Sequence, residues 1–161
     1  MRWVSAGHFH ITLKFLGEVE NKRLLEAQRA LSALAGRFEP FDFTVSGIGA
    51  FPDFERAQVF WAGIAEGAET LGRLAAETEK EFQAIGFPKE TRPFHAHVTL
   101  GRVRSLKNNE SLQKMISVMK QEERSQGFRG RAGRFSFYKS TLTPEGPVYE
   151  VLSRHELSEK K

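Results

Sequence analysis

The sequence contains no cysteine, which excludes disulfide scaffolds, thiolate zinc sites and cysteine nucleophiles. It has no apolar run near the roughly 20 residues that a membrane-spanning helix needs, and residues 1–5 do not resemble a signal peptide. Tyrosine and tryptophan are scarce, with two of each, but 14 phenylalanines supply apolar rings for a core and exclude a mainly disordered chain. We therefore expect a soluble, cytoplasmic protein that does not contact a membrane.

The length and charge of the chain say little about its partner. Its 161 residues suit one domain or two small lobes that share a core. The net charge of +4 leans only weakly towards a polyanionic partner. Residues 120–139 hold most of the excess, because their only acids are Glu122 and Glu123. A phosphate-attracting face and a solvated helix end with a charged edge strand explain this stretch equally well.

Hydrophobic periodicity predicts two similar halves, each built as strand–helix–strand–strand. The first half covers 8–16, 21–36, 41–45 and 59–64, a linking helix covers 69–85, and the second half covers 95–103, 110–124, 135–142 and 148–152. Helices that alternate with pairs of strands are typical of an α+β fold with mostly antiparallel sheets. We expect one bilobal domain over residues 1–161, with two pseudo-symmetric lobes, helices on the outside and an active-site cleft between the lobes.

The two halves differ in what precedes them. A strand at 59–64 and a helix at 69–85 come before the second half, and nothing comparable comes before the first. If the halves are related by symmetry, a strand–helix unit is missing ahead of Met1, which would leave a sheet edge and part of the core uncovered.

One short motif occurs twice in the chain. Residues 8–13 read His-Phe-His-Ile-Thr-Leu, and residues 95–100 read His-Ala-His-Val-Thr-Leu, so the repeat uses four of the five histidines. Side chains two positions apart on a strand point to the same face. In each copy the second histidine and the threonine therefore share a face: His10 with Thr12, and His97 with Thr99.

Two such pairs brought together suit acid–base chemistry on a phosphodiester. Imidazoles titrate near pH 6.5, so one can be neutral and the other protonated near neutral pH. A neutral imidazole can take a proton from a water or hydroxyl, and a protonated one can give a proton to the leaving oxygen. Threonine hydroxyls beside them can hold the non-bridging oxygens, where negative charge must be stabilised.

Two other interpretations of the repeat remain. A single His-x-Thr on a strand is usually an ordinary polar face, although two equivalent copies favour a site. The four histidines could instead bind zinc. No Asp or Glu accompanies either pair at close spacing, and threonine is a poor metal ligand. Acid–base chemistry is therefore favoured, and we expect neither a metal nor another cofactor.

The residues resemble the 2H phosphoesterases, which are named for two His-x-Thr-x motifs, and most of all their RNA 2′,3′-cyclic phosphodiesterases, also called the 2′-5′ RNA ligase family. Four segments that span nearly the whole chain carry the resemblance: 3–19 with the first motif, 59–64, 94–102 with the second motif, and the closing hairpin 140–149. Ala96 stands where the family commonly has proline, and a strand and helix normally precede the first motif.

The resemblance implies that His10 is the proton donor, that His97 is the proton acceptor, and that Thr12 and Thr99 hold phosphate oxygens. The implied reaction opens the 2′,3′-cyclic phosphate of an RNA end to a 2′-phosphate without metal; run backwards with an RNA 5′-hydroxyl, it forms a 2′-5′ linkage. Pseudo-symmetry lets either histidine play either part. Expected partners are RNA ends with cyclic phosphates, such as tRNA fragments, and small cyclic nucleotides, bound by a monomer. A non-catalytic RNA-binding module of the same fold is the main alternative.

Several other side chains are candidates for the same site. Lys14, on the His10 face, and Arg102, just after the second motif, are expected to contact phosphate, although a structural salt bridge suits each as well. Phe9 and Phe51 are candidates for base stacking or for the core. The remaining histidines have weaker assignments: His8 and His95 line the cleft or are ordinary strand residues, and His155, near the charged tail, has no role.

Overall fold

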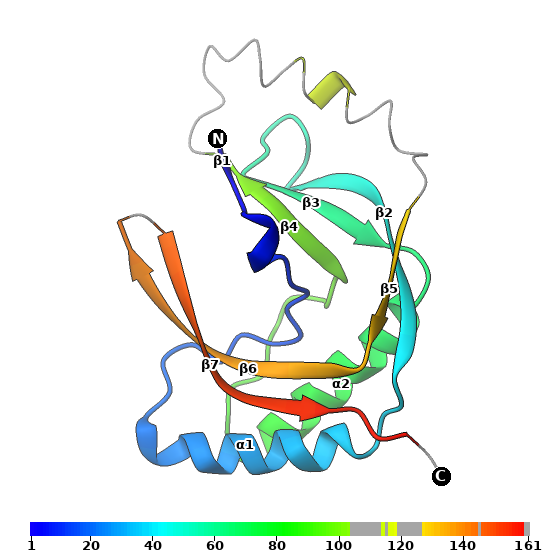
Figure 1. Ribbon diagram of the computed structural model, residues 1–161. Helices are drawn as coiled ribbons and strands as arrows, with labels where there is room; N and C mark the ends of the chain where they lie inside the picture. The colour runs from blue at the N-terminus through cyan, green and yellow to red at the C-terminus, as the bar shows by residue number, and fades with distance from the viewer. Residues whose placement is uncertain (104–113, 115, 119–126, 145, 160–161) are drawn as a thin grey trace. The chain divides into compact units, whose positions relative to one another are not determined.

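The computed structural model describes residues 1–103, 114, 116–118, 127–144 and 146–159 (Figure 1). The chain forms two compact units, each assembled from three stretches of sequence. Unit 1 comprises residues 1–13, 42–72 and 94–130, and unit 2 comprises residues 14–41, 73–93 and 131–161.

Unit 1 is built on a five-stranded sheet with the strand order β1-β4-β3-β2-β5. Its strands are β1 (Arg2–Trp3), β2 (Phe41–Phe51), β3 (Val59–Ile64), β4 (His97–Arg102) and β5 (Phe128–Ala132). The pairs β1–β4, β2–β3 and β3–β4 are antiparallel. The first residue of β2 and the last two of β5 lie outside unit 1. These strands bring the second histidine motif into the interior of a sheet.

One face of this sheet carries the core of unit 1. Ala50 lies opposite Phe60, and Ala62 lies opposite Val98, so these four side chains share a face. All four are buried, Phe60 completely. Ala57 and Ile116 complete the core cluster against Ala50 and Phe60. The opposite face is therefore free to carry polar chemistry.

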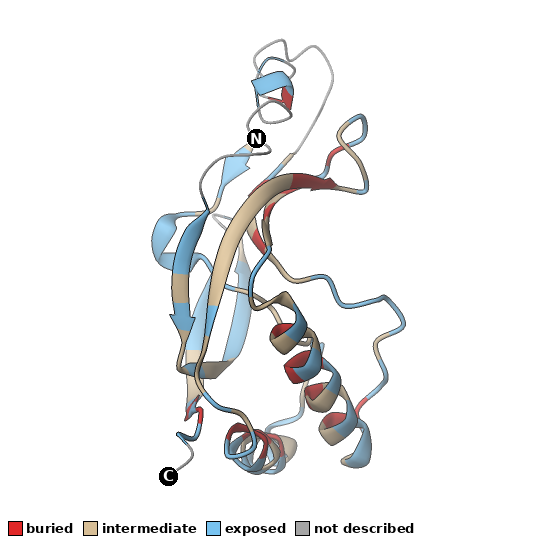
Figure 2. Cartoon of the chain, turned by 90° about the vertical axis from the view of Figure 1, so that its right-hand side faces the viewer, coloured by how far each residue is buried: buried red, intermediate tan, exposed pale blue. Residues whose placement is uncertain are grey.

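Unit 2 contains α1 (Asn21–Ala35), most of α2 (Ala68–Ala84) and the ribbon of β6 (Arg134–Thr143) and β7 (Gly146–Glu156). Each helix is buried along one side (Figure 2). Apolar residues three and four positions apart make these sides. They are Ala27, Leu31, Leu34 and Ala35 of α1, and Leu74, Ala75 and Phe82 of α2. Glu20 rather than Asn21 occupies the N-cap of α1, and its side chain makes no capping bond.

The β6–β7 ribbon is antiparallel and contains one β-bulge. Phe137 pairs with Ser153 and Tyr138 pairs with Val151, so Leu152 is the extra residue. The amide of Gln28 in α1 donates a hydrogen bond to the carbonyl of Leu152. The ribbon is thus held to α1 at the bulge.

His155, to which the sequence analysis gives no role, is a buried residue of the ribbon. It is 6% exposed. The Oγ of Ser32 lies 3.1 Å from its Nδ1, and the Oγ of Ser153 lies 2.8 Å from its Nε2. Its ring stacks on Phe135 with centroids 5.5 Å apart. Both ring nitrogens are therefore satisfied inside unit 2.

This burial makes the stability of the protein depend on pH. Burial lowers the pKa of His155 below its ordinary value of 6.5, so the unfolded chain takes up this proton at a higher pH than the folded protein. The stability contributed by the neutral ring is complete above about pH 6.5 and is lost as the pH falls through the folded pKa. We expect the urea-unfolding free energy of the wild type to fall more than that of His155→Gln between about pH 8 and pH 5.

The exposed His8 provides the control for this comparison. The His8→Gln variant should follow the wild type at every pH, because its ring is exposed in both states. Each protein is compared with itself across pH, so an overall loss of stability in His155→Gln does not hide the effect. Equal acid sensitivity in all three proteins would contradict this role of His155.

The antiparallel α+β architecture predicted from the sequence is confirmed. The helices predicted over 21–36 and 69–85 are α1 and α2, and the predicted closing hairpin is β6–β7. Of the helix predicted over 110–124, only residues 114 and 116–118 are described, and they are helical; the rest lies outside the described residues. The described part of the chain contains no helix long and apolar enough to cross a membrane.

The strand predicted over 8–16 is wrong. Residues 6–8 form a 3-10 helix, η1 (Ala6–His8), and of the predicted stretch only Ile11 makes a β-bridge. The ring of His10 donates a hydrogen bond to the carbonyl of His8. The alternating pattern is therefore present without the strand that it predicts.

Candidate active site

The first histidine motif follows β1, on the side of β4 that faces away from β3. Arg2 and Trp3 pair with Arg102 and Gly101, and the N–H of Val4 donates to the carbonyl of Leu100. The chain then leaves the edge through η1 and returns to it at residue 11. Both motifs consequently belong to unit 1.

An antiparallel bridge between Ile11 and Val98 sets the register of the two motifs. Val98 is a core residue, so its neighbours on β4, His97 and Thr99, turn to the opposite face. His10 and Thr12 flank Ile11 but lie outside any strand. Continued by one residue on each side, the antiparallel register would set His10 opposite Thr99 and Thr12 opposite His97, and we expect all four side chains on that face.

The two motif histidines make equivalent hydrogen bonds. The Nδ1 of His10 lies 2.6 Å from the carbonyl oxygen of His8, and the Nδ1 of His97 lies 2.7 Å from the carbonyl oxygen of His95. A carbonyl oxygen only accepts, so Nδ1 carries the hydrogen in both rings. Nε2 is then the atom of each ring that can take up or release a proton.

Aromatic rings surround His97. The ring of Phe51 lies 5.2 Å from it edge-on, the ring of Trp61 lies at 6.2 Å and that of His95 at 5.8 Å. His95 is itself 4.6 Å from Trp61 and 5.5 Å from Phe51. Burial, and then the charge of the neighbouring His97, lower the pKa of His95. The neutral form of His95 is therefore favoured.

A glycine on β2 lets Trp61 take this position. Gly49 lies opposite Trp61, and a Cβ built on Gly49 would come within 2.1 Å of the indole. The indole therefore lies flat against the backbone of β2. On its other side Trp61 pairs with Thr99 of β4, so the indole lies on the same face of the sheet as Thr99 and His97. Its Nε1 is buried and has no hydrogen-bond partner among the described residues.

Arg102 reaches the same face because of a β-bulge. Simple alternation from His97 would send Arg102 to the core face with Val98. However, Trp61 pairs with Thr99 while Phe60 pairs with Gly101, which makes Leu100 an extra residue. The bulge shifts the alternation by one, so Arg102, opposite Val59, faces the histidine side and is exposed. A contact of Arg102 with phosphate stays a prediction.

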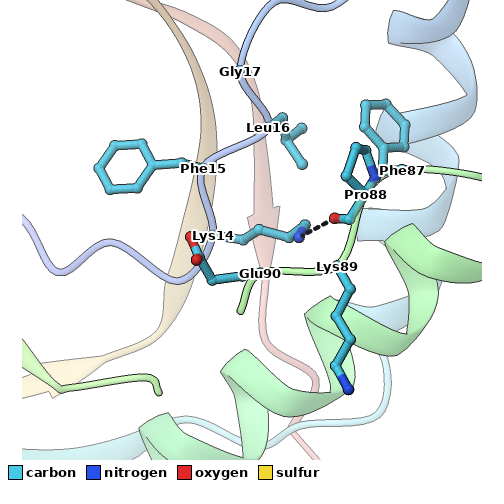
Figure 3. A pocket seen from close by; sticks show the side chains of 8 residues that line it. All are labelled: Lys14, Phe15, Leu16, Gly17, Phe87, Pro88, Lys89 and Glu90. Carbon is cyan, nitrogen blue, oxygen red and sulfur yellow. Dashed lines mark hydrogen bonds between the residues drawn. The ribbon is translucent and has the colours of Figure 1, made fainter. Parts of the chain in front are cut away.

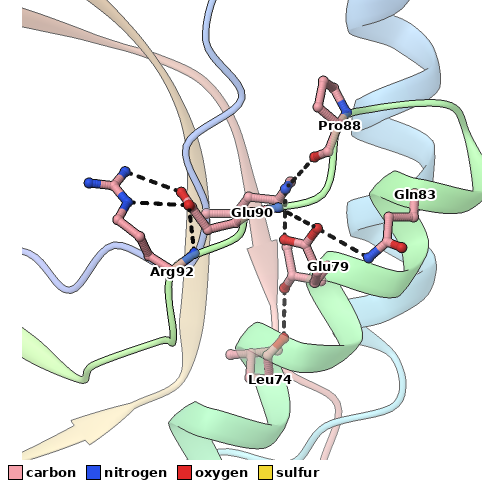
Figure 4. A network of polar contacts seen from close by, with 8 residues as sticks. Leu74, Glu79, Gln83, Pro88, Glu90 and Arg92 are labelled. Carbon is pink, nitrogen blue, oxygen red and sulfur yellow. Dashed lines mark hydrogen bonds and ion pairs between the residues drawn. The ribbon is translucent and has the colours of Figure 1, made fainter.

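Lys14 has a structural partner in unit 2. Its side chain is 4% exposed, and its Nζ lies 2.7 Å from a carboxylate oxygen of Glu79 and 3.0 Å from the carbonyl of Pro88. Glu79 also accepts hydrogen bonds from the amide of Gln83 and the backbone N–H of Glu90 (Figure 4). Burial raises the pKa of Glu79, but the hydrogen bonds from Lys14 and Glu90 outweigh it and hold that pKa below its usual range. A contact of Lys14 with phosphate stays a prediction.

The ammonium of Lys14 also borders a small pocket of unit 2. The pocket has a volume of about 190 Å³ and is lined by residues 14–17 and 87–90 (Figure 3). Its lining combines the apolar residues Leu16 and Phe87 with the charged residues Lys14, Lys89 and Glu90. Because the ammonium already contacts a carboxylate, the pocket offers an anion little net positive charge.

Removing this ammonium should affect stability. In Lys14→Met the partly buried carboxylate of Glu79 loses its cation, which we expect to cost about 1–3 kcal/mol in the free energy of unfolding by urea. The double variant Lys14→Met/Glu79→Gln should recover part of this loss, because it leaves no unpaired charge. A single variant as stable as the wild type would contradict the pairing.

His8 and Phe9 are the remaining candidates. The Nδ1 of His8 contacts the Oγ of Ser5 at 3.1 Å, and Phe9 is 47% exposed. Within the described ranges, no three His, Asp or Glu side chains come close enough together to hold a metal ion. No local pattern marks Trp61 as a neighbour of His97; the glycine opposite it on the adjacent strand marks that position only once the register is known.

Comparisons with known proteins find similar sequences over most of the chain. Relatives named RNA 2′,3′-cyclic phosphodiesterase from Aeropyrum pernix and Thermotoga maritima are 36% and 37% identical over 152 and 151 residues. The alignments cover 94% of this chain and 84% of the first relative, and 93% of this chain and 76% of the second.

Solved structures show the same fold. A crystal structure of a protein from Thermus thermophilus is 26% identical with a TM-score of 0.77, covering 97% of this chain and 81% of that one. The crystal structure of E. coli LigT with 3′-AMP is 28% identical with a TM-score of 0.69, covering 98% and 82%. The model of the LigT-like phosphoesterase family matches residues 1–61 and 63–149. The chain therefore belongs to the LigT-like phosphoesterase family, as the two His-x-Thr motifs indicated.

Proposed function

We propose that this protein opens 2′,3′-cyclic phosphates at RNA ends to 2′-phosphates by metal-independent acid–base catalysis. The bridge between Ile11 and Val98, the residues that separate His from Thr in each motif, is the observation that supports this proposal. The name shared by the relatives, RNA 2′,3′-cyclic phosphodiesterase, supports the substrate class. Cyclic mononucleotides are the smallest substrates that contain the reacting group.

In the proposed reaction the two histidines act on opposite sides of phosphorus. Nε2 of His97 takes a proton from a water molecule while the oxygen of that water bonds to phosphorus. The bond from phosphorus to the 3′ oxygen breaks. Nε2 of His10 gives its proton to that leaving oxygen, so the products are a 2′-phosphate and a 3′-hydroxyl. The hydroxyls of Thr12 and Thr99 donate to the non-bridging oxygens, and the guanidinium of Arg102 offsets their charge.

The assignment of His97 as the base and His10 as the acid follows the resemblance of the two motifs to those of the 2H phosphoesterases. The rings of Phe51, Trp61 and His95 lie near His97, whereas His10 is exposed.

The test is an assay of 2′,3′-cyclic AMP opening in excess EDTA, with the product identified by phosphorus NMR. Adenosine 2′-phosphate formed at an unchanged rate supports the proposal. Loss of activity with EDTA, restored by zinc, would show the metal alternative to be correct. Formation of the 3′-phosphate would mean that the 2′ oxygen leaves. No turnover of any cyclic phosphate, with RNA still bound, would indicate a non-catalytic binding module.

The same site should also open the cyclic phosphate with a nucleophile other than water. An RNA 5′-hydroxyl can take the place of water, with His97 as its base, and attack the cyclic phosphate to form a 2′-5′ linkage. We propose that this ligation accompanies hydrolysis when 5′-hydroxyl ends are abundant. Incubation of two RNA fragments with matched ends, followed by digestion with a nuclease specific for 3′-5′ linkages, would reveal a resistant junction.

A further inference from the structure

The β6–β7 ribbon of unit 2 has two different faces. Phe135 and His155 lie opposite each other on the face that turns to α1, where His155 meets Ser32. Alternation then sends the even-numbered residues of β6 to the other face. On β7 the bulge at Leu152 shifts the alternation, so Val151 and Tyr149 join that face through their partners Tyr138 and Ser140. We call it the outer face of the ribbon.

The outer face combines exposed aromatic rings with arginines. Tyr138 and Tyr149 are 48% and 36% exposed, and their rings meet edge to face at 6.2 Å. This contact confirms that both rings lie on one face. Leu142 next to them is 84% exposed. Large side chains exposed this far on one face mark a contact surface rather than a core.

Two arginines continue the outer face beyond the tyrosines. Arg154 pairs with Ser136 across the ribbon, and Arg134 pairs with Glu156. Arg154 is exposed and makes no ion pair with any residue that the structure describes. The side chain of Arg134 is 61% exposed, and its guanidinium is 3.8 Å from Glu156. Such a pair is weak in water, so both guanidinium groups remain open to an anion.

We infer that the outer face of the ribbon binds the single-stranded RNA that carries the cyclic phosphate. Bases stack on Tyr138 and Tyr149, and Arg154 and Arg134 contact phosphates of the same strand. Proteins commonly bind single strands by aromatic rings for the bases and cations for the backbone. An apolar protein partner would leave both arginines unpaired, which favours RNA. The inference rests on the proposed function for the identity of its ligand.

The test compares a long and a short substrate. The long substrate is an RNA of about ten nucleotides, within the usual site size of such surfaces, with a 2′,3′-cyclic phosphate end; the short one is 2′,3′-cyclic AMP. We expect Tyr138→Ala and Tyr149→Ala each to lower kcat/KM for the RNA by about 5- to 100-fold. Turnover of cyclic AMP should change less than about twofold, because a mononucleotide has no neighbouring bases to stack on the ribbon. Tyr138→Phe should keep most of the activity on RNA, because it keeps the stacking ring.

The arginines of the outer face should affect the salt dependence of RNA binding. Arg154→Ala should weaken RNA binding at low salt and reduce the slope of log affinity against log salt by about 0.7. The matched control is Lys139→Ala, which removes a cation from the other face of the same ribbon. It should leave both the RNA activity and the salt slope nearly unchanged.

The outcomes separate this inference from the proposed function. Equal losses on both substrates in the tyrosine variants would overturn the inference, because they would indicate damage to folding or to the chemistry. Unchanged RNA affinity in Tyr149→Ala and Arg154→Ala would also overturn it. If the wild type opens neither substrate, the proposed function fails, and fluorescence anisotropy with the same RNA bearing a 3′-hydroxyl still decides whether the outer face binds a single strand.

Discussion

Replacement of His97 by alanine is expected to lower kcat for 2′,3′-cyclic AMP by about 10²- to 10⁴-fold, the range for a lost general acid or base. The variant keeps the core side of β4, because Val98 and its neighbours are unchanged. KM should change little, since the proposed phosphate contacts of Thr99 and Arg102 do not involve the ring of His97. The measurement is steady-state kinetics near neutral pH. His10→Ala should cause a loss of similar size.

The double variant and a third histidine complete this test. Groups that act in one step are not additive, so His10→Ala/His97→Ala should lose much less than the product of the two single effects. His8→Ala should retain nearly full activity, because its carbonyl still accepts the hydrogen bond from His10 and its ring contacts Ser5. Activity that survives in His97→Ala would contradict the role of this ring as the base.

The second large effect should come from a glycine that touches no substrate. In Gly49→Val the new Cβ would come within 2.1 Å of the Trp61 indole, so the indole must leave its place. Phe51 and His95 pack on that indole, and they also contact His97. We expect a loss of about 1–3 kcal/mol in the free energy of unfolding from overpacking. We also expect kcat to fall by about 10-fold or more, because positioning errors near 1 Å are costly.

Two further variants show whether the clash is the cause. Trp61→Phe removes part of the indole that meets the new Cβ, so Gly49→Ala should cost less stability in that background than in the wild type, as a double-mutant cycle measures. Gly72→Ala is the matched control: its added Cβ meets nothing within 4 Å on α2, so it should be neutral or stabilising by about 0.5–1 kcal/mol. Equal costs of Gly49→Ala in both backgrounds would contradict this explanation.

Local pattern predicted much of the architecture. The apolar stripes of α1 and α2 follow the period of a helix, and the alternation around His97 follows that of a strand, so both could be assigned without tertiary contacts. The turn at residues 143–146 ended the predicted hairpin where β6 and β7 join. The same reasoning failed for residues 8–16: their alternation is real, but the stretch begins in η1 and only Ile11 makes a bridge to β4.

The face on which Arg102 lies could not be derived from alternation. The bulge at Leu100 depends on how β4 pairs with β3, and spacing along one strand does not encode that pairing. Lys14 likewise has the spacing of a site residue, but its ammonium binds Glu79, which lies 65 positions away. His155 is buried because Ser32 and Phe135 meet it from other elements.

The sequence by itself determined which residue types are available for chemistry, through a motif repeated 87 positions apart, and it determined the helices and most of the strands, because these depend on neighbours within a few residues. The tertiary structure alone decided which candidates share a surface. The bridge from Ile11 to Val98, the bulge at Leu100 and the glycine beneath Trp61 set that arrangement. Each of these is a pairing between distant segments, and the geometry of such pairings follows from packing of the folded chain rather than from any local pattern.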